Sequence, residues 1–245
     1  IIFEKTSTLL NSNIIVAKQN MKKTMNYIKY TISQNQSNKI YFGEDFSYSI
    51  SENNFFYYED KFSGLKLPMP NILGQHQLEN ISTAIATLRS IDQLNIKEDH
   101  IKQGITKINN IARLQEITSG KLKNLVGNNK LLVDGSHNPL GAKVLDKYLE
   151  SLDCNKHIII GMMANKDHEN YISYFKDISS ITTIDIPNQL NAIDGKKLKD
   201  KFKSFPNIKY SESIEQAIKS INLNQGDMLI ITGSLYLCSE ILKIN

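Results

Sequence analysis

Cysteine is scarce in this sequence: the 245-residue chain has two, Cys154 and Cys238, which lie far apart. So few cysteines exclude a framework of disulfides and fit a reducing compartment. The chain also lacks any apolar run of about 18 residues, the length at which a stretch becomes a candidate membrane-spanning helix. From these absences we expect a cytoplasmic protein with no membrane partner.

An excess of one charge is also lacking, because 29 Lys and Arg stand against 25 Asp and Glu, a formal net charge of +4. The basic residues are spread along the chain and do not form the clustered footprint of a nucleic-acid-binding protein. Tyr and Phe concentrate between residues 41 and 58, but basic residues do not alternate with them, which disfavours a base-stacking platform. We therefore expect no nucleic-acid partner, and a mild positive field that attracts anionic substrates.

The first residues, Ile1–Lys5, include no initiator Met and no basic or apolar region of a signal peptide. They have the character of the middle of a strand or helix, so we expect a segment of a longer chain. The sequence contains no Gly-x-x-x-x-Gly-Lys-Ser/Thr P-loop, and the nearest approach, at Gly135, has the wrong spacing. Residues 1–245 by themselves are therefore not expected to hydrolyse ATP.

What the sequence does contain is a stretch from Leu131 to Pro139 around which the chain is organised. An apolar strand ends at Asp134, a polar turn follows, and residues 140–152 have the pattern of an amphipathic helix with Asn138 as its N-cap. At the carboxyl end of a parallel strand such a turn binds ligands, because helix N–H groups favour an anion and Asp134 can accept from a ribose hydroxyl. The alternative is that Asp134 and Asn138 only cap a turn.

The first half of the chain has mixed periodicity and ends at a polar hinge, residues 109–111, which is the expected domain boundary. Before the hinge, Pro68 and Pro70 predict a loop that runs to Gly74. The predicted strands are 13–19, 39–42, 48–51 and 55–58, and the predicted helices are 20–33, 75–91 and 98–108.

After the hinge, strands and helices alternate, which predicts a mostly parallel sheet with helices on both faces. The predicted strands are 114–117, 131–133, 157–160, 181–186, 208–210 and 228–232, and the predicted helices are 140–152, 169–176, 195–202, 214–221 and 235–243.

Two further clusters carry residues suited to a nucleotide. Residues 74–80, Gly-Gln-His-Gln-Leu-Glu-Asn, end the proline loop, and Asn80 offers a donor and an acceptor for an adenine edge or a phosphate oxygen. Arg113, just past the hinge, suits a phosphate clamp that forms when two domains close. The alternatives are that His76 and Gln77 only cap a helix and that Arg113 forms a surface salt bridge.

Taken in order, these clusters resemble folylpolyglutamate synthase/dihydrofolate synthase, of the Mur ligase superfamily. The resemblance implies an α/β fold in two parts. Residues 1–110 would be the C-terminal part of the central, ATP-binding domain, and residues 111–245 the Rossmann-like, mostly parallel C-terminal domain. The matching motifs are Phe-Glu-Lys at 3–5, Gly-x-His-Gln-x-x-Asn at 74–80, Arg-x-Gln at 113–115, Asp-x-x-His-Asn-Pro at 134–139, Ile-Gly-Met-Met-x-x-Lys-Asp at 160–167 and Thr-Gly-Ser-Leu-Tyr at 232–236.

The resemblance also implies an activity: an ATP-dependent acid–amino-acid ligase of the EC 6.3.2 type. Such an enzyme joins L-glutamate to dihydropteroate or tetrahydrofolate through an acyl phosphate, with ATP and Mg²⁺ as its cofactors, and the full-length protein would be a monomer. Two other interpretations stay open. One is a muramyl-peptide ligase of the same superfamily, which Gly-x-His-Gln and Asp-x-x-His-Asn-Pro disfavour, and the other is a non-catalytic nucleotide-binding remnant.

The site residues follow from the same resemblance. Asn80, Arg113 and Asp134 would contact ATP, with Arg113 at the phosphates and Asp134 at the ribose. Lys5 would be a catalytic lysine that is carbamylated and so becomes an oxygen ligand for Mg²⁺. His137 would be a catalytic histidine that orients the substrate or nucleotide.

One further residue and two departures complete this prediction. Ser234 would help to hold glutamate. Thr6-Ser7-Thr8 replaces the family's Ala-Gly-Ile, and Asn191 stands near a usual Arg. Because Arg113 and Asp134 lie at the ends of elements, where truncation opens no core cavity, we expect their Ala variants to keep the fold.

Overall fold

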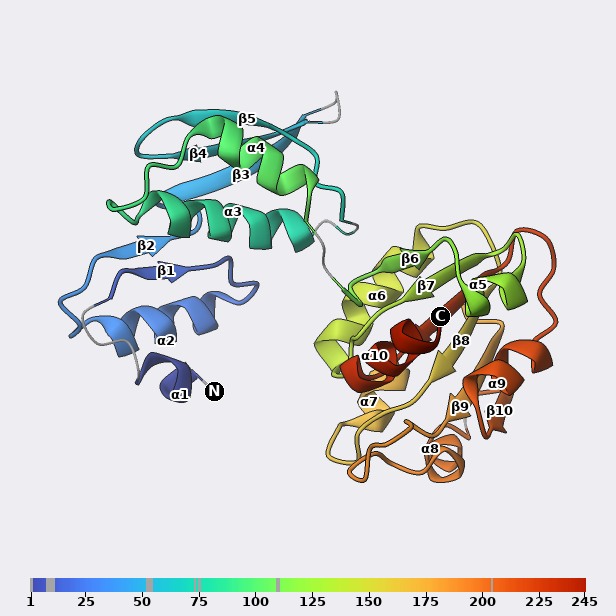
Figure 1. Cartoon of the computed structure of the whole chain (residues 1–245). Coiled ribbons are helices and arrows are strands. Elements are labelled where there is room, and N and C mark those ends of the chain that lie inside the picture. The colour runs from blue at the N-terminus through green and yellow to red at the C-terminus, as the bar shows by residue number, and fades with distance from the viewer. Residues whose placement is uncertain are drawn as a thin grey trace. The chain divides into compact units, whose positions relative to one another are not determined.

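The structure is a computed structural model that describes residues 2–7, 12–51, 55–72, 74, 76–108, 111–203 and 205–245. It divides into two compact units, Ile1–Asn109 and Asn110–Asn245, called unit 1 and unit 2 below (Figure 1). The hinge residues Asn109 and Asn110 lie outside the described residues, as does Gln75 at the start of a predicted helix.

Unit 1 contains a pair of parallel strands, a three-stranded antiparallel sheet in the order β3-β4-β5, and helices packed on them. Its elements are α1 (Ile2–Thr6), β1 (Ile14–Val16), α2 (Lys22–Ile32), β2 (Lys39–Tyr41), β3 (Phe46–Ser51), β4 (Phe55–Asp60), β5 (Gly64–Pro68), α3 (His76–Arg89) and α4 (Glu98–Thr106).

The main core of unit 1 lies between the antiparallel sheet and the helices α3 and α4. Successive side chains of a strand point to opposite faces, so Phe56 and Tyr58 of β4 share one face and are fully buried. Leu65 and Leu67 of β5 lie on the same face, and the helices supply Ile85 and other apolar residues. This alternation explains why the sheet has one packed face.

Unit 2 is built on a six-stranded sheet in the order β10-β9-β8-β11-β7-β6, in which all neighbours are parallel except β6 and β7. Its elements are β6 (Gln115–Ile117), α5 (Lys121–Val126), β7 (Lys130–Val133), α6 (Pro139–Glu150), β8 (Lys156–Ile160), α7 (His168–Ile172), β9 (Ser180–Ile184), α8 (Gly195–Lys201), β10 (Ile208–Ser211), α9 (Ile214–Ser220), β11 (Met228–Thr232) and α10 (Leu235–Ile244).

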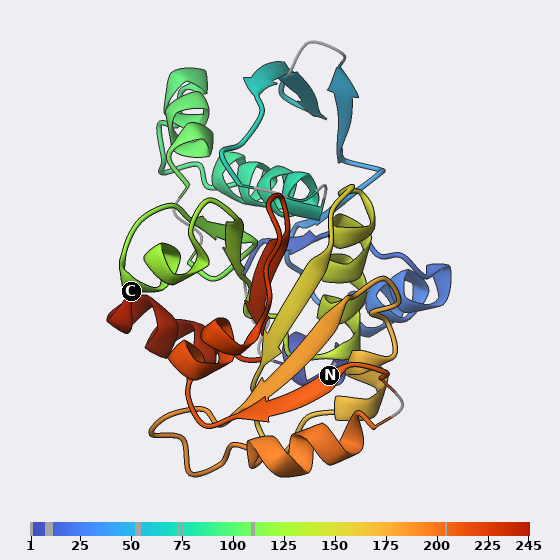
Figure 2. The same ribbon diagram turned by 90° about the vertical axis from the view of Figure 1, so that its right-hand side faces the viewer.

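Both faces of this sheet are covered. Helices α5, α9 and α10 form one apolar core with it, and α6, α7 and α8 form the other. Figure 2 shows α9 and α10 on one side of the strands and α7 and α8 on the opposite side. Sheets of this kind bury their strands on both faces, which is why β8 and β11 are buried along their whole length. The predicted mostly parallel α/β fold is confirmed.

The connections of unit 2 open a crevice at one edge of the sheet. β7 and β11 are neighbours, but the chain leaves β7 for α6 on one face and leaves β11 for α10 on the other. Where adjacent parallel strands send their helices to opposite faces, the turns that follow them separate, and ligands bind there in folds of this class.

Two elements were missed and one was misjudged from the sequence. The expected loop at Pro68 and Pro70 begins later, because β5 occupies Gly64–Pro68 at the edge of its sheet, where a proline is tolerated. Helix α5 was missed because Asn245, remote in sequence, caps it by accepting from the Leu122 N–H. The helix expected to run to residue 176 ends at Ile172.

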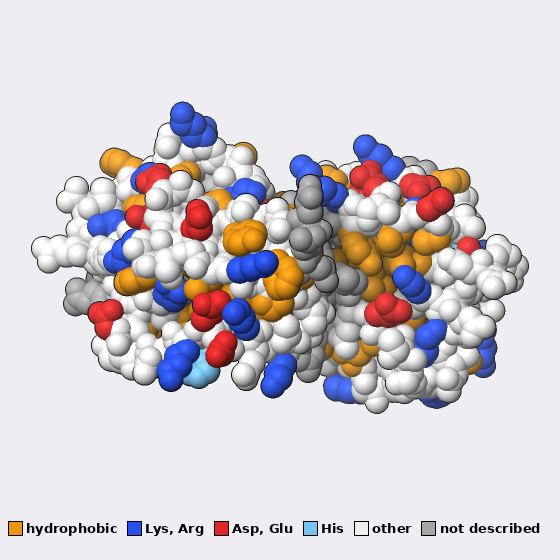
Figure 3. Space-filling model, turned by 90° about the horizontal axis from the view of Figure 1, so that it is seen from above, with side chains coloured by type: hydrophobic (Ala, Val, Ile, Leu, Met, Phe, Trp, Pro, Cys, Tyr) orange, Lys and Arg blue, Asp and Glu red, His pale blue; other side chains and the backbone are white. Residues whose placement is uncertain are grey.

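The surface matches the balanced composition. Figure 3 shows Lys and Arg interspersed with Asp and Glu on the face it presents, without a large area of one sign. Among the helices that the structure describes, none is long and apolar enough to cross a membrane.

Candidate functional site

The turns that follow the parallel strands of unit 2 meet at the carboxyl edge of the sheet. Because β7, β8, β9 and β11 run in the same direction, their carboxyl ends lie together. The segments that start there are residues 134–138, 161–167, 185–194 and 233–234. Every candidate residue that the sequence places after residue 133 is on one of these segments.

The turn after β7 is fixed by its own side chains. The Asp134 carboxylate accepts from the Ser136 N–H at 2.9 Å and the Leu114 N–H at 2.9 Å, and it is 6% exposed. Asn138 caps α6 by accepting from the Gly141 N–H at 2.8 Å, as predicted. Asp134 therefore holds the turn and ties it to the segment before β6.

That segment presents Arg113 to solvent from a strained backbone. Ala112 and Leu114, on either side of it, are buried and have left-handed φ angles of 56° and 47°. The Ala112 carbonyl accepts from the Gly135 N–H at 2.7 Å, so both neighbours of Arg113 are bound to the β7 turn. Such strain persists only where the surroundings enforce it, and it is typical of functional segments.

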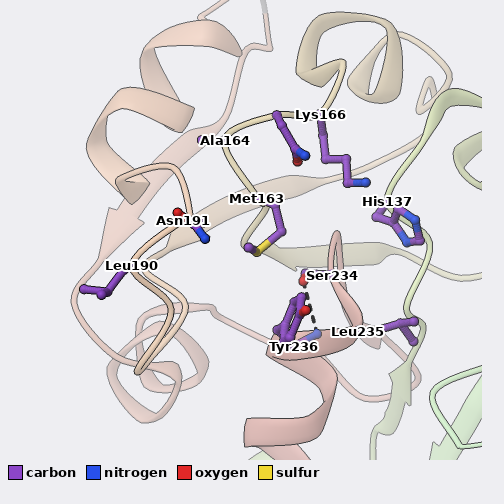
Figure 4. A pocket seen from close by; sticks show the side chains of 10 residues that line it. His137, Met163, Ala164, Lys166, Leu190, Asn191, Ser234, Leu235 and Tyr236 are labelled. Atoms are coloured by element: carbon purple, nitrogen blue, oxygen red, sulfur yellow. Dashed lines mark hydrogen bonds between the residues drawn. The ribbon is translucent and has the colours of Figure 1, made fainter.

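A cleft of about 700 Å³ opens at this carboxyl edge of unit 2 (Figure 4). His137 comes from the β7 turn, Lys166 from the turn after β8, and Ser234 from the turn after β11. In the figure Lys166 and His137 lie on one side, and Leu190 and Asn191 on the other. The lining residues are His137, Met163, Ala164, Asn165, Lys166, Leu190, Asn191, Ser234, Leu235 and Tyr236.

The side chains of the cleft suit an anionic ligand that also carries an amine or amide group. Of the described residues that line it, none is acidic, and Lys166 supplies a cation. His137 Nδ1 lies 2.9 Å from the Gly135 carbonyl, which can only accept, so this nitrogen carries a proton and Nε2 is left as the acceptor of the neutral ring. Ser234 is the N-cap of α10, where its Oγ accepts from the Tyr236 N–H at 3.1 Å, and its hydroxyl donates to no acceptor among the residues that the structure describes.

Two loops of the cleft wall are joined to each other. The Ala164 N–H donates to the Asn191 carbonyl at 2.9 Å, and the Ile193 N–H donates to the Met162 carbonyl at 3.0 Å. His168 adds a third restraint, because its Nε2 donates to the Met163 carbonyl at 3.0 Å. The loop that carries Asn191 is therefore held in place against the loop that carries Lys166.

The structure brings two of the predicted site residues together in this cleft, His137 and Ser234, with Asp134 and Arg113 on the adjoining turns. Asn80 and Lys5 belong to unit 1. Asn80 donates to the Gln77 amide oxygen at 3.1 Å, which joins it to the predicted helix cap, and Lys5 is exposed on α1.

Three residues near the cleft had no place in the predicted site. Lys166 belongs to the motif at residues 160–167, but its position as a cation that lines the cleft depends on where β8 ends. Met163 lines the cleft for the same reason. Tyr171 is buried close to the turns, and only its position in the motif-bearing half could have suggested it.

Magnesium is the cofactor that the family resemblance implies. It prefers carboxylate and other oxygen ligands. Within the described ranges, no three His, Cys, Asp or Glu side chains gather where they could hold a metal ion. These side chains alone do not make a metal centre.

Comparison with known proteins gives a family and a fold. The family model described as "Mur ligase, glutamate ligase domain" matches residues 113–235. Escherichia coli FolC in complex with ADP is 21% identical with a TM-score of 0.77 over 96% of this chain and 54% of that chain. Folylpolyglutamate synthase from Thermotoga maritima is 23% identical with a TM-score of 0.75 over 100% of this chain and 58% of that chain.

A third structure, the bifunctional folylpolyglutamate synthase/dihydrofolate synthase from Yersinia pestis, is 18% identical with a TM-score of 0.75 over 96% of this chain and 53% of that chain. The chain thus spans little more than half the length of these proteins, whose likeness shows the fold. A search among curated proteins gives no significant match. The family match covers half of the sequence and lies within unit 2, so the chain belongs to the Mur ligase family and carries its glutamate ligase domain.

Proposed function

We propose that this chain is part of an ATP-dependent ligase that joins L-glutamate to dihydropteroate or a folate. The observation that carries the proposal is the cleft at the carboxyl edge of unit 2, which has a cation and no acidic lining residue within the family's glutamate ligase domain. A dicarboxylic amino acid needs a site of this charge. The structural likeness to folate-linked ligases supports the choice of the second substrate.

In the proposed reaction, a carboxylate oxygen of the pteroyl substrate attacks the γ-phosphorus of ATP, and ADP leaves. The amine of L-glutamate then attacks the acyl carbon, inorganic phosphate leaves, and the nitrogen loses a proton to give the amide. Lys166 would hold a glutamate carboxylate, and the Ser234 hydroxyl would donate to it. His137, with Nε2 unprotonated, would accept from the incoming amine.

The nucleotide would lie against the adjoining turns. Arg113 is exposed, and the buried residues on either side of it hold its backbone in place. A guanidinium that binds phosphate needs this exposure. Asp134 already accepts two backbone N–H groups, but a carboxylate has further acceptor sites for a ribose hydroxyl. Asn80 of unit 1 would contact the base or a phosphate. Related proteins have been solved with ADP, and with AMPPNP and Mn, which supports a nucleotide and a divalent ion here.

Lys5 remains a proposed carbamate. Lys5 is exposed on α1, and its carbamate would be an oxygen ligand for Mg²⁺. Mg²⁺ bound there would offset the charge of the transferring phosphoryl group.

Two other functions differ from this one in their amino-acid substrate or in phosphate release. A muramyl-peptide ligase would use the same cleft for another amino acid, and a nucleotide-binding remnant would bind ATP without releasing phosphate. The folate-linked ligase is favoured by the lining cation and by Asp-x-x-His-Asn-Pro, which directly follows β7.

The test is to measure phosphate release by the full-length protein that contains this chain. We expect release that needs ATP, L-glutamate and a pteroyl substrate together. A muramyl substrate should give none. Phosphate release that does not depend on L-glutamate would contradict the proposal.

A further inference from the structure

Three buried hydroxyl groups form a closed triangle next to the turns of the cleft. Tyr171 Oη lies 2.9 Å from Ser136 Oγ and 3.0 Å from Thr232 Oγ1, and those two oxygens are 3.1 Å apart. Tyr171 and Thr232 are fully buried, and Ser136 is 5% exposed. A hydroxyl donates once and accepts, so a ring of three satisfies every member.

The triangle joins two of the turns that line the cleft. Ser136 precedes His137 in the turn after β7, and Thr232 ends β11 just before Ser234. Tyr171 Oη is also 3.2 Å from the Ser136 carbonyl, which accepts from the Gly233 N–H at 3.1 Å. The two turns are therefore connected both directly and through Tyr171.

At Gly233, the turn after β11 approaches the turn after β8 so closely that a side chain would not fit. Gly233 has a φ of 101°, and a Cβ there would lie 2.7 Å from the Gly161 carbonyl oxygen. The glycine thus lets the turn after β11 contact the turn after β8. His168, on α7 like Tyr171, holds that β8 loop through the Met163 carbonyl. Helix α7 consequently sends a buried polar side chain to each of two neighbouring parts of the cleft wall.

We propose that Tyr171 is a positioning residue that sets the distance between His137 and Ser234 in the cleft, an inference that rests on the proposed function. Tyr171 does not line the cleft, so it acts through Ser136 and Thr232. Burial raises the pKa of the Tyr171 hydroxyl, which stays protonated and keeps its donor. Without the hydroxyl, Ser136 and Thr232 still contact each other, so the turns become looser without coming apart.

The experiment compares Tyr171→Phe with Tyr174→Phe in the full chain. Tyr174 is half-buried against the same core, and its hydroxyl has no hydrogen bond within the part of the chain that the structure describes, so the matched variant deletes the same atom without touching the triangle. L-Glutamate is titrated while the amide signals of His137 and Ser234 are followed by NMR. Hydrogen exchange of the Gly233 amide and the melting temperature are measured in the absence of glutamate.

We expect Tyr171→Phe to weaken glutamate binding about fivefold, the effect of one ordinary hydrogen bond, and to speed exchange at Gly233 by a similar factor. The melting temperature should change little, and Tyr174→Phe should resemble the wild type in all three measurements. Ser136→Ala removes another corner of the triangle and should reproduce the loss of affinity if Tyr171→Phe proves too unstable to study.

Several results would overturn the inference. Wild-type affinity and wild-type Gly233 exchange in Tyr171→Phe would show that the hydroxyl positions nothing, while leaving glutamate binding established. Equal losses in Tyr174→Phe would mean that any change in this core has the same effect. If the wild type binds no glutamate, the proposed function of the cleft fails separately, and unchanged Gly233 exchange in Tyr171→Phe would still reject the connection between the turns.

Discussion

The two units differ in how completely they cover their sheets. In unit 2, helices bury both faces of six strands in two large cores. In unit 1, the parallel strands β1 and β2 share a small core, whose buried members among the residues that the structure describes are Ile14, Val16 and Ile32. Parallel sheets are ordinarily buried on both faces, so β1 and β2 are stabilised by much less apolar packing than the strands of unit 2. The difference indicates that both the stability and the candidate cleft of this chain are concentrated in unit 2.

The largest difference between the units is expected when each is expressed alone. We expect residues 111–245 alone to unfold in one cooperative thermal transition, because their cores are internal to unit 2. Residues 1–110 alone should associate, since Phe3, Met21 and Tyr30 on or beside the first two helices are more than half exposed. Circular dichroism and light scattering would measure both. If residues 111–245 self-associated while residues 1–110 stayed monomeric, unit 1 and not unit 2 would be the self-sufficient part of the chain.

A matched pair of core truncations compares the units within the intact chain. Ile159→Ala, in the fully buried strand β8, should lower the free energy of unfolding of unit 2 by about 4 kcal/mol. Ile32→Ala, in the small core under α2, should cost about 2 kcal/mol because its surroundings can collapse more easily. Denaturant titrations with probes in each unit give the two values, and equal costs would show that the cores are equally tight.

The next largest loss of stability is expected for Asp134→Ala. From the sequence this variant was expected to keep the fold, but the structure gives the carboxylate a structural role. The carboxylate accepts the buried Leu114 and Ser136 N–H groups, and truncation leaves both without a partner. We expect a loss of about 3 kcal/mol from unit 2. Arg113→Ala should stay within about 0.5 kcal/mol of the wild type, because the side chain is exposed. Arg113 is therefore the cleaner variant for nucleotide titrations, and a stable Asp134→Ala protein would refute the turn-holding role.

A smaller effect is expected at the opposite edge of the unit 2 sheet. Burial opposes the ionisation of Asp227, but hydrogen bonds from the Asn224 N–H and Asn155, with His157 beside it, bring the net pKa of this carboxyl below its usual value. A lowered pKa in the folded state stabilises the protein above the unfolded pKa of about 4 and loses this contribution as the pH falls toward the folded pKa.

Asp227→Asn should accordingly cost about 1 kcal/mol at pH 7, and the difference from the wild type should shrink below about pH 4. The control is Glu98→Gln in unit 1, whose exposed pair with Lys102 should contribute nothing measurable. Unfolding curves from pH 7 down to the acid limit provide the test, and a difference that grows on acidification would have the wrong sign.

How far the sequence could predict this molecule depended on how local each signal was. The alternation after the hinge and the Asn138 cap are local, and the sequence predicted both. The antiparallel direction of β6 and the helix α5 are set by partners remote in sequence, such as Asn245, and they could not be predicted. The same holds for Tyr171, whose partners Ser136 and Thr232 are 35 and 61 residues away.

For the site, motif spacing placed His137 and Ser234 on turns that do meet. It did not predict that Asp134 would be committed to two backbone N–H groups, because one of them belongs to Leu114, 20 residues earlier. Nor did it predict Lys166 as a lining cation, since the end of β8 and the fold of the following loop decide where this side chain points.

An L-glutamate titration of residues 1–245, followed residue by residue by NMR, tests whether the cleft of unit 2 binds glutamate. We expect saturable shifts confined to unit 2 and centred on His137, Lys166 and Ser234. In Lys166→Ala we expect the affinity to fall about tenfold, the loss expected for a charged hydrogen bond. D-Glutamate or L-alanine should bind more weakly. Shifts at the opposite edge of the sheet around Asp227, or full affinity in Lys166→Ala, would contradict the assignment of the cleft.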